Sequence, residues 1–510
     1  MTTTTTRRET AAEWQRSLIR QDEIDRYLDD GRDFIDEPAI EATLSRGVAL
    51  AGDELRSRVR AAIDKAYTIK LMDDDDVAAL LAVRDPDLRD EVAAAAEAIK
   101  AKVYDNRVVT FAPLYCGSKC VNSCKYCGFR ADNGAVERRV LTMDEIRAET
   151  KVLAGTIGHK RLVVVYGEHP ETDADYIADS MRAVYSVKAP ARNGSGEIRR
   201  VNINAAPLPI DGLKKLAAAG IGTYQVFQET YHKATYADVH PAGTLKGNYR
   251  WRLYALHRAM DAGIDDVAVG ALFGLYDWRF EVMGLVAHAR DLERRYGIGP
   301  HTVSVPRLEP AAGTDFSWVR HWVSDDDFRY LVAVLRLAIP YAGLIVTNRE
   351  SPEMLRSVIR MCTQRDADTR VGIGAYTEAF APGAQRVENQ QFMLGDTRSL
   401  DAIVRELAGM GHIVSFCTAG YRCGRTGKKI MGLLESGREG CFCKLNAVLT
   451  FQEWLEDFAS PETVSIGNAI IDKEMGEIAK RVPADYSPSL YRAFTEARAR
   501  VLAGERDLYF

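Results

Sequence analysis

The chain has 510 residues, 46% of them apolar and 27% charged. This length exceeds the size at which one hydrophobic core keeps growing, so we expect more than one structural unit. The formal net charge of -5 argues against nucleic acid as a partner, and apolar runs far shorter than the ~20 residues of a membrane helix argue against a membrane. Because the chain starts without an apolar signal segment, we expect a cytoplasmic protein.

The first 105 residues form two predicted segments that precede the first strand pattern. Residues 1–35 open with a threonine tract and predict a disordered or extended N-terminus. Residues 36–105 predict a helical extension, because Asp36 is suited to cap a helix and Asp73 to Asp76 put negative charge at the start of another.

Residues 106–410 alternate short β-branched runs with longer helical patterns, as in the strand-helix units of a parallel sheet. The expected strands are 108–115, 161–168, 200–206, 223–229, 266–273, 302–308, 344–349 and 371–376. Eight such units predict an α/β fold, a (β/α)8 barrel of the TIM type, whose active site lies at the C-terminal ends of the strands.

Polar side chains stand at several of these expected strand ends. They are Glu168, Asn204, Glu229, Arg307 and Arg349. Because the C-terminal strand ends of a barrel meet at one rim, we expect these residues to surround a common site.

The remaining segment, residues 411–510, predicts a smaller and mostly helical C-terminal domain. Thr450 and Glu453 have the spacing of a capping box and predict a helix that starts at Thr450. Eight of the nine cysteines fall within 116–127 and 417–443, and such clusters in a reducing compartment are typical of metal ligands.

The first cysteine group has the spacing CxxxCxxC, with Cys120, Cys124 and Cys127. Three thiolates from one loop leave the fourth iron of a 4Fe-4S cubane without a protein ligand, so that iron is open to a small molecule. The alternative is a structural zinc with Cys116 as a fourth ligand. Cys116 by itself also reads as a small, buried apolar residue.

CxxxCxxC after the first strand of an α/β barrel resembles the radical S-adenosylmethionine (SAM) superfamily, and Tyr126 occupies its usual aromatic position. Gly167 and Glu168 resemble the family element that faces the methionine amino group of SAM. The resemblance implies a cluster that binds SAM, takes one electron from a reductant such as flavodoxin or ferredoxin, and releases a 5′-deoxyadenosyl radical.

Longer stretches are similar to the HydG/ThiH family of tyrosine lyases, from about residue 35 to 460. The matching stretches are 111–115, 159–162, 196–202, 222–232, 273–277 and 299–307. This resemblance implies cleavage of the Cα–Cβ bond of L-tyrosine to p-cresol and dehydroglycine, with hydrogen abstraction from the amino group.

The same resemblance makes Glu229 and Arg307, with Asn204 beside them on the rim, candidates to hold SAM. It makes Arg349 and Arg370 candidates to grip the substrate carboxylate through bidentate contacts. For any one arginine, a salt bridge at the barrel rim is an equal alternative.

Residues 363–370 depart from the family pattern of small residues followed by arginine. They introduce Arg365, Asp366 and Asp368, which leaves the identity of the substrate open.

The second cysteine group resembles the auxiliary-cluster domain of HydG, in which a CxxC pair and a third cysteine bind a second iron–sulfur cluster. These positions fall on Cys417, Gly420 and Cys443, so the middle ligand is absent. Cys423 and Cys441 lie close by in the chain. A rearranged iron–sulfur cluster on Cys417, Cys423, Cys441 and Cys443, a zinc ion on the same thiols, and a domain without metal all remain open.

We therefore predict a radical SAM tyrosine lyase. Formation of CO and cyanide, with hydrogenase maturation proteins as partners, stays open because of Gly420. One alternative is a lyase recruited to another pathway or another aromatic amino acid. Another is a non-catalytic metal-bound scaffold, which would not need Gly167, Glu168, Glu229 and Arg307 at barrel strand ends.

Overall fold

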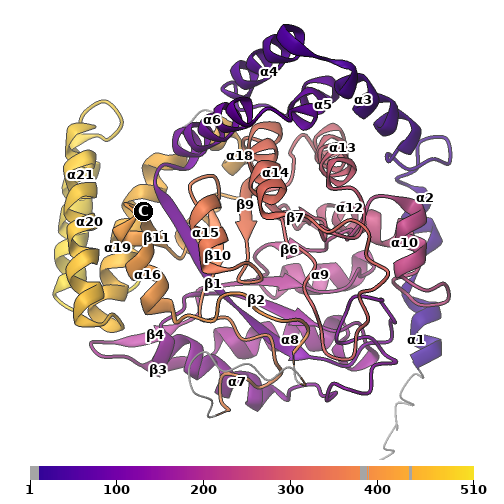
Figure 1. The fold of residues 1–510 in the computed structure, drawn as a ribbon. Helices are drawn as coiled ribbons and strands as arrows, with labels where there is room; N and C mark the ends of the chain where they lie inside the picture. The colour runs from indigo at the N-terminus through magenta and orange to yellow at the C-terminus, as the bar shows by residue number, and fades with distance from the viewer. Residues whose placement is uncertain (1–10, 379–387, 389, 436–438) are drawn as a thin grey trace, which may run out of the picture.

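A closed parallel barrel forms the centre of this computed structural model, which describes residues 11–378, 388, 390–435 and 439–510 (Figure 1). The barrel strands pair in the order β1, β2, β5, β6, β7, β8, β9, β10, and β10 pairs back with β1. Their bounds are β1 Arg107–Gly117, β2 Arg161–Tyr166, β5 Arg200–Asn204, β6 Tyr224–Gln225, β7 Val267–Gly270, β8 Thr302–Ser304, β9 Gly343–Val346 and β10 Gln364–Asp366. The predicted (β/α)8 fold is confirmed.

Seven of the eight predicted strands overlap an observed strand, and the eighth prediction was wrong. Gly372 forms only an isolated bridge with Gln390, residues 373–376 form turns, and Gly374 there has a φ of +75°. The eighth strand is instead β10, which was overlooked because it contains Arg365 and Asp366. Tertiary contacts make its burial possible, since Arg365 donates hydrogen bonds to Asn348 and Asp396.

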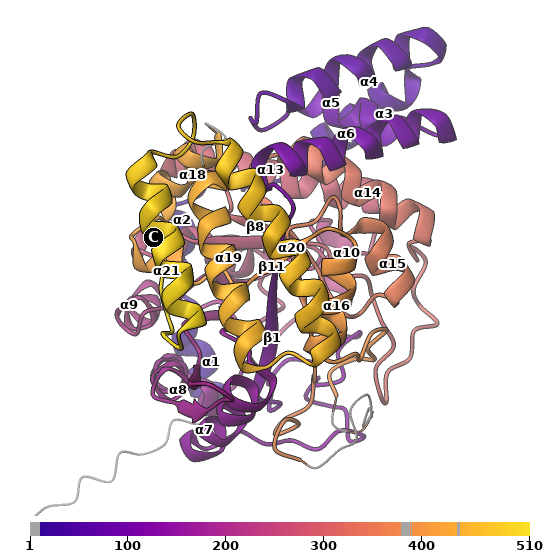
Figure 2. The ribbon, with the colours of Figure 1, turned by 90° about the vertical axis from the view of Figure 1, so that its left-hand side faces the viewer.

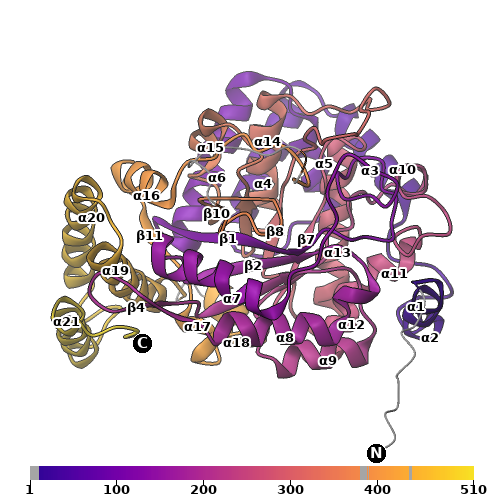
Figure 3. The same ribbon diagram turned by 90° about the horizontal axis from the view of Figure 1, so that it is seen from below.

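Helices surround the barrel, and Figure 3 shows α7, α8 and α9 along one side of it. The bounds are α7 Met143–Lys151, with the π-helical turn η1 Val152–Ile157 after it, the 3-10 turn η2 Pro170–Thr172, α8 Ala174–Tyr185, α9 Ile210–Ala218, α10 Lys233–Val239, α11 Tyr249–Leu253, α12 Ala255–Asp261, α13 Trp278–Tyr296, α14 Asp325–Ala338, α15 Pro352–Val358 and α16 Leu400–Gly409. A short antiparallel hairpin, β3 Lys188–Pro190 with β4 Ser195–Glu197, projects after α8. Within the described part of the chain, every helix is too short or too polar to cross a lipid bilayer.

Helices also form most of the segment before the barrel, and α3 to α6 arch over one side of it in Figure 1. Their bounds are α1 Ala11–Leu18, α2 Gln21–Asp25, α3 Glu37–Ala49, α4 Gly52–Ala66, α5 Asp74–Ala82 and α6 Pro86–Tyr104. The cap predicted at Asp36 is present, since Asp36 accepts a hydrogen bond from the Ala39 amide. The acidic run opens α5 as expected, and Asp73 caps it by accepting a hydrogen bond from the Asp76 amide.

The expectation of a disordered or extended N-terminus does not hold for residues 11–35, which include α1 and α2. Residues 1–10 lie outside the described residues. Trp14 and Ile24 are buried in the main core, and the Tyr27 hydroxyl donates to Asp261 at 2.7 Å. Contacts with the barrel helices therefore order a segment that its composition alone predicts to be disordered or extended.

The C-terminal segment is joined to the barrel by β11 Ile413–Ser415, which pairs with the start of β1. Its helices are α17 Ala419–Arg422, α18 Gly427–Glu435, α19 Glu439–Asp457, α20 Pro461–Lys480 and α21 Pro488–Leu502. Figure 2 shows α19, α20 and α21 side by side.

The capping box predicted at Thr450 was wrong, because α19 already begins at Glu439. Inside this helix the Thr450 hydroxyl donates to the Asn446 carbonyl. Glu453 forms buried ion pairs with Lys160 and Arg199, both at 2.7 Å. Glu453 therefore does not cap a helix; its ion pairs hold the C-terminal segment against the barrel.

Candidate active site

The loop after β1 brings Cys120, Cys124 and Cys127 to the wall of one cavity of about 230 Å³ at the C-terminal mouth of the barrel. Two side-chain amides point at these sulfurs: Asn122 Nδ2 lies 3.7 Å from Cys120 Sγ, and Gln391 Nε2 lies 3.6 Å from Cys127 Sγ. Amide donors to sulfur stabilise thiolates and tune the metal they hold. The donor set therefore fits a cluster bound by three cysteines.

Cys116 does not share this cavity. It is fully buried within β1, where burial and the nearby Glu149 carboxylate raise the pKa of its thiol. In the described ranges, no three His, Cys, Asp or Glu side chains converge on the place of a single metal ion. This arrangement argues against the alternative of a four-cysteine zinc site.

The end of β2 approaches the cysteine loop at Gly167 and Glu168. A Cβ atom on Gly167 would lie 2.2 Å from the Lys119 carbonyl oxygen, so only glycine allows this approach. Glu168 is buried, and its Oε2 accepts a hydrogen bond from Asn122. Its Oε1 has no hydrogen-bond partner among the described residues, and burial raises the pKa of this carboxyl group. A buried, half-satisfied carboxylate in the cavity wall fits a ligand that carries an amino group.

Glu229 faces the same cavity from the fourth strand unit with a φ of +72°, which is rare for a residue with a side chain. It forms ion pairs with Lys246 at 2.7 Å and Arg252 at 3.1 Å. Although burial raises the pKa of Glu229, these two cations outweigh burial and hold the pKa below its usual range. Asn204 lines this wall too, so Glu168, Asn204 and Glu229 of the predicted rim border one cavity.

Tyr126 also lines the cavity, and its hydroxyl lies 2.8 Å from His240 Nε2. The Lys246 ammonium lies 5.5 Å from the centre of the Tyr126 ring. These contacts fix the loop between the second and third cysteines to the segment that follows α10.

The three candidate arginines occupy different places. Arg349 lines the cavity, stacks with its guanidinium carbon 3.3 Å from the centre of the Phe392 ring, and has a pKa that burial lowers. Arg307 lies behind the wall, where its Nε donates to Glu350 at 3.0 Å and its Nη1 to Asp325 at 2.8 Å. Arg370 donates to the Ala375 carbonyl at 2.9 Å. Arg307 and Arg370 therefore make contacts within the barrel rim, which was the alternative to ligand binding. Of the three, Arg349 is the one placed to meet a ligand.

Several cavity residues were missed from the sequence, because most of them lie on loops, Arg252 lies on α11, and only the fold brings them to the cavity. They are Asn122, Lys246, Arg252, Glu309 and Gln391. Asp366 also lines the cavity, and its only signal in the sequence was the charged segment 363–370. Burial, together with the neighbouring Glu350 carboxylate, raises the pKa of Glu309 to about 7.

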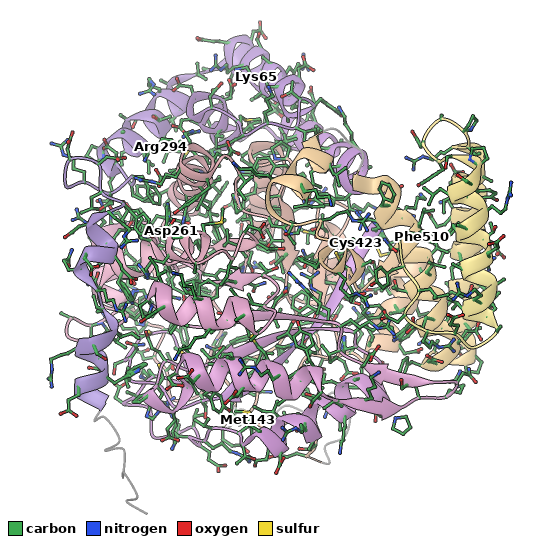
Figure 4. All side chains as sticks on the ribbon, turned by 180° about the vertical axis from the view of Figure 1, so that it is seen from behind. Lys65, Met143, Asp261, Arg294, Cys423 and Phe510 are labelled. Carbon is green, nitrogen blue, oxygen red and sulfur yellow. The ribbon has the colours of Figure 1, made fainter. Side chains whose placement is uncertain are left out.

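The second cysteine group is only partly assembled. Cys417 and Cys443 line a small cavity of about 10 Å³ at the opposite end of β1, together with Gly420. Cys423 follows α17 and is not part of that wall (labelled in Figure 4). Cys441 belongs to α19, but its side chain lies outside the described residues. The described residues thus bring two of the four expected thiols together.

Buried arginine side chains place positive charge near these two thiols. Arg161 and Arg200 are buried nearby, and the Arg200 guanidinium carbon lies 2.9 Å from the centre of the Tyr421 ring. Buried guanidinium groups favour anionic partners such as metal thiolates. The charge of this site suits a metal–thiolate group, whereas two thiols supply fewer ligands than a cluster or a structural zinc requires.

Comparisons with known proteins agree with this geometry. A model of the radical SAM superfamily matches residues 114–282, and a model of the biotin and thiamin synthesis associated domain matches residues 304–413. The 2-iminoacetate synthase of Salmonella typhimurium is 28% identical over 71% of this chain and 92% of its own length. A crystal structure of HydG, a maturase of the [FeFe]-hydrogenase, is 41% identical with a TM-score of 0.86, and covers 94% of this chain and 100% of its own. HydG from Carboxydothermus hydrogenoformans is 34% identical with a TM-score of 0.73, over 90% of this chain and 99% of its own.

Proposed function

Since the chain belongs to the HydG/ThiH family of radical SAM carbon–carbon lyases, we propose that it cleaves the Cα–Cβ bond of L-tyrosine to p-cresol and dehydroglycine. The observation that carries the proposal is the single cavity lined by the three cysteines of the CxxxCxxC loop, by Glu168 and by Arg349. A non-catalytic scaffold would have no use for a half-satisfied carboxylate and a buried arginine facing one space.

In this proposal Cys120, Cys124 and Cys127 hold a 4Fe-4S cluster. Together with SAM and one electron from a flavodoxin or ferredoxin, a cluster held there would supply the radical chemistry for hydrogen abstraction from the substrate. Glu168 accepts hydrogen bonds from the amino group of SAM through Oε1, which lacks a partner among the described residues. Glu229, fixed by Lys246 and Arg252, adds a second carboxylate to the same wall.

Arg349 is proposed to bind the substrate carboxylate. Its guanidinium carbon lies 3.3 Å from the centre of the Phe392 ring, so this contact orients its donors before the substrate arrives. Holding the carboxylate there keeps the amino acid head group at the end of the cavity that carries the cysteine loop, where hydrogen abstraction takes place.

A second candidate function is further conversion of dehydroglycine to CO and cyanide in the C-terminal segment, in support of hydrogenase maturation. The whole-chain similarity to HydG favours it. Gly420 opposes it, because a glycine stands where the small cavity of Cys417 and Cys443 needs a third ligand. We therefore propose that the reaction stops at dehydroglycine, and that any metal bound by these thiols lacks the full ligand set of an auxiliary cluster.

The proposal predicts the products of an anaerobic assay with reconstituted protein, SAM, dithionite and L-tyrosine. We expect 5′-deoxyadenosine and p-cresol in equal amounts, with glyoxylate from hydrolysis of dehydroglycine and without CO or cyanide. Deoxyadenosine without p-cresol would exclude tyrosine as the substrate. CO and cyanide would establish the second function, and absence of deoxyadenosine from iron-loaded protein would overturn the radical assignment.

Glu309 gives a pH dependence that tests the role of Arg349. With a pKa of about 7, Glu309 is neutral below that pH and anionic above it, where it competes with the substrate carboxylate for Arg349. We therefore expect KM for tyrosine to rise by about tenfold between pH 6 and pH 8. Glu309→Gln should keep KM low across this range.

Glu353→Gln is the matched control, because Glu353 lies on the surface of α15 and should leave the pH profile unchanged. A wild-type KM that stays flat from pH 6 to pH 8 would show that Glu309 does not face the bound substrate carboxylate.

A further inference from the structure

Asp366 brings a buried carboxylate to the inner wall of the same cavity. It lies on β10 in register with Phe111 of β1, and register partners in a parallel sheet point to the same face. Both residues line the cavity. Phe111 in turn packs with Val163 and Ile345 in a small apolar cluster inside the barrel. Asp366 therefore stands at the edge of an apolar floor, within the part of the cavity formed by the barrel strands.

Two donors hold this carboxylate in place. The backbone amide of Asn348 donates to Oδ1 of Asp366 at 2.7 Å, and the Thr369 hydroxyl donates to Oδ2 at 2.8 Å. Asp366 is only 5% exposed, and burial raises the pKa of its carboxyl group. A charged group this deep needs further partners to offset its lost hydration.

The charge of the adjacent Arg365 partly offsets the effect of burial on the pKa of the Asp366 carboxyl group, but its side-chain hydrogen bonds go to other groups. Arg365 directs its Nη2 to Asn348 Oδ1 at 2.8 Å and to Asp396 Oδ2 at 3.1 Å. Each carboxylate oxygen accepts about two hydrogen bonds, Asn348 and Thr369 each use one, and the backbone of Asp366 itself also contacts the carboxylate. Acceptor capacity thus remains on Asp366, which lines the cavity.

The position of Asp366 relative to Arg349 sets the orientation of a ligand. Val346 of β9 pairs with Arg365 of β10, and β9 ends at Val346, so Arg349 lies in the turn that follows β9, beyond the level of Asp366. For an amino acid whose carboxylate binds Arg349, the apolar floor of Phe111 and Ile345 is the part of the cavity suited to its ring, and Asp366 borders that floor.

We propose that Asp366 is a specificity-determining residue that accepts a hydrogen bond from the para substituent of an aromatic amino acid substrate, and so selects rings that carry a donor there. This inference rests on the proposed lyase function and narrows its substrate class. Tyrosine and 4-aminophenylalanine satisfy the requirement, whereas phenylalanine leaves the buried carboxylate without the expected partner.

The test is calorimetric binding of L-tyrosine, 4-amino-L-phenylalanine and L-phenylalanine to the reconstituted holoenzyme with SAM, under anaerobic conditions. We expect both donor-bearing amino acids to bind wild type about 50-fold more tightly than phenylalanine, as for a hydrogen bond to a charged acceptor. In Asp366→Ala the preference should shrink to about fivefold or less. Asp366→Asn, which keeps the shape and one acceptor oxygen, should fall between them.

Asp368→Asn is the control. Asp368 lies two residues along the chain, has a φ of +48° that asparagine tolerates, and faces Arg370 at 3.7 Å and not the cavity. This variant should keep the wild-type preference.

Two results would overturn the inference. The inference fails if phenylalanine binds the wild-type protein as tightly as tyrosine does. It also fails if Asp366→Ala keeps the wild-type preference for tyrosine over phenylalanine. In either case, continued p-cresol formation from tyrosine would show that the lyase function stands. If none of the three amino acids binds and no p-cresol forms while deoxyadenosine is made, the proposed function itself fails, and the role of Asp366 fails with it.

Discussion

Cys124→Ala is expected to remove the visible absorbance of the iron–sulfur cluster and to reduce deoxyadenosine formation to the uncatalysed background, a loss of more than ~10⁶-fold. Cys124 is 5% exposed and lines the cavity between the other two cysteines of the loop. Two remaining thiolates leave a cubane with two irons lacking protein ligands, and the cluster is then lost to solvent or chelators. Iron content, the absorption spectrum and deoxyadenosine formation measure the effect together.

Cys116→Ala is the matched control for this loss. Cys116 is four residues before the motif and fully buried, but it lies outside the cavity wall, so the variant should keep its iron and its deoxyadenosine formation. Equal loss of metal in both variants, with zinc and not iron in the wild-type protein, would instead establish the four-cysteine zinc site.

Gly420→Cys is expected to create a second cluster site. A Cβ atom at this position would meet its nearest neighbours, the Arg425 carbonyl oxygen and Cβ, at 3.9 and 4.0 Å, which are ordinary contacts. The new thiol would join Cys417 and Cys443 at the small cavity that Gly420 already lines. We expect one additional 4Fe-4S cluster per chain by iron analysis and electron paramagnetic resonance, and formation of CO and cyanide from tyrosine where wild type makes neither.

Gly432→Cys controls for an extra thiol, since Gly432 lies on α18 with nothing within 4 Å of an added Cβ atom. It should not change iron content or products. A wild-type protein that already holds two clusters and releases CO would contradict our proposal, and would mean that Cys423 and Cys441 replace the missing ligand.

The residues that sequence reasoning located well are those with local signals. The cap at Asp36 and the acidic helix start at Asp73 to Asp76 need only polar side chains and the next few backbone amides, and the structure has both. Seven barrel strands were found because a buried parallel strand is a run of apolar residues. The eighth was misplaced because Arg365 and Asp366 interrupt that run, and their partners are remote in sequence.

The same distinction holds for the arginines. Arg307, Arg349 and Arg370 looked alike in the sequence, and only the packed barrel separates a guanidinium that faces the cavity from two that face Glu350 and the Ala375 carbonyl. Side-chain direction at the end of a strand depends on neighbouring strands and loops, which a linear pattern does not contain.

By itself, the sequence determined the cysteine loop, the barrel class and the glycine at position 420, because each is a matter of residue type and spacing along the chain. The tertiary structure alone decided that Glu168 and Arg349 face one cavity, that Cys116 is outside it, and that Asp366 stands beside Phe111 on its inner wall. The physical reason is that a site in a closed barrel is assembled from separate strand ends, and the register between strands, set by long-range pairing and packing, determines which side chains meet.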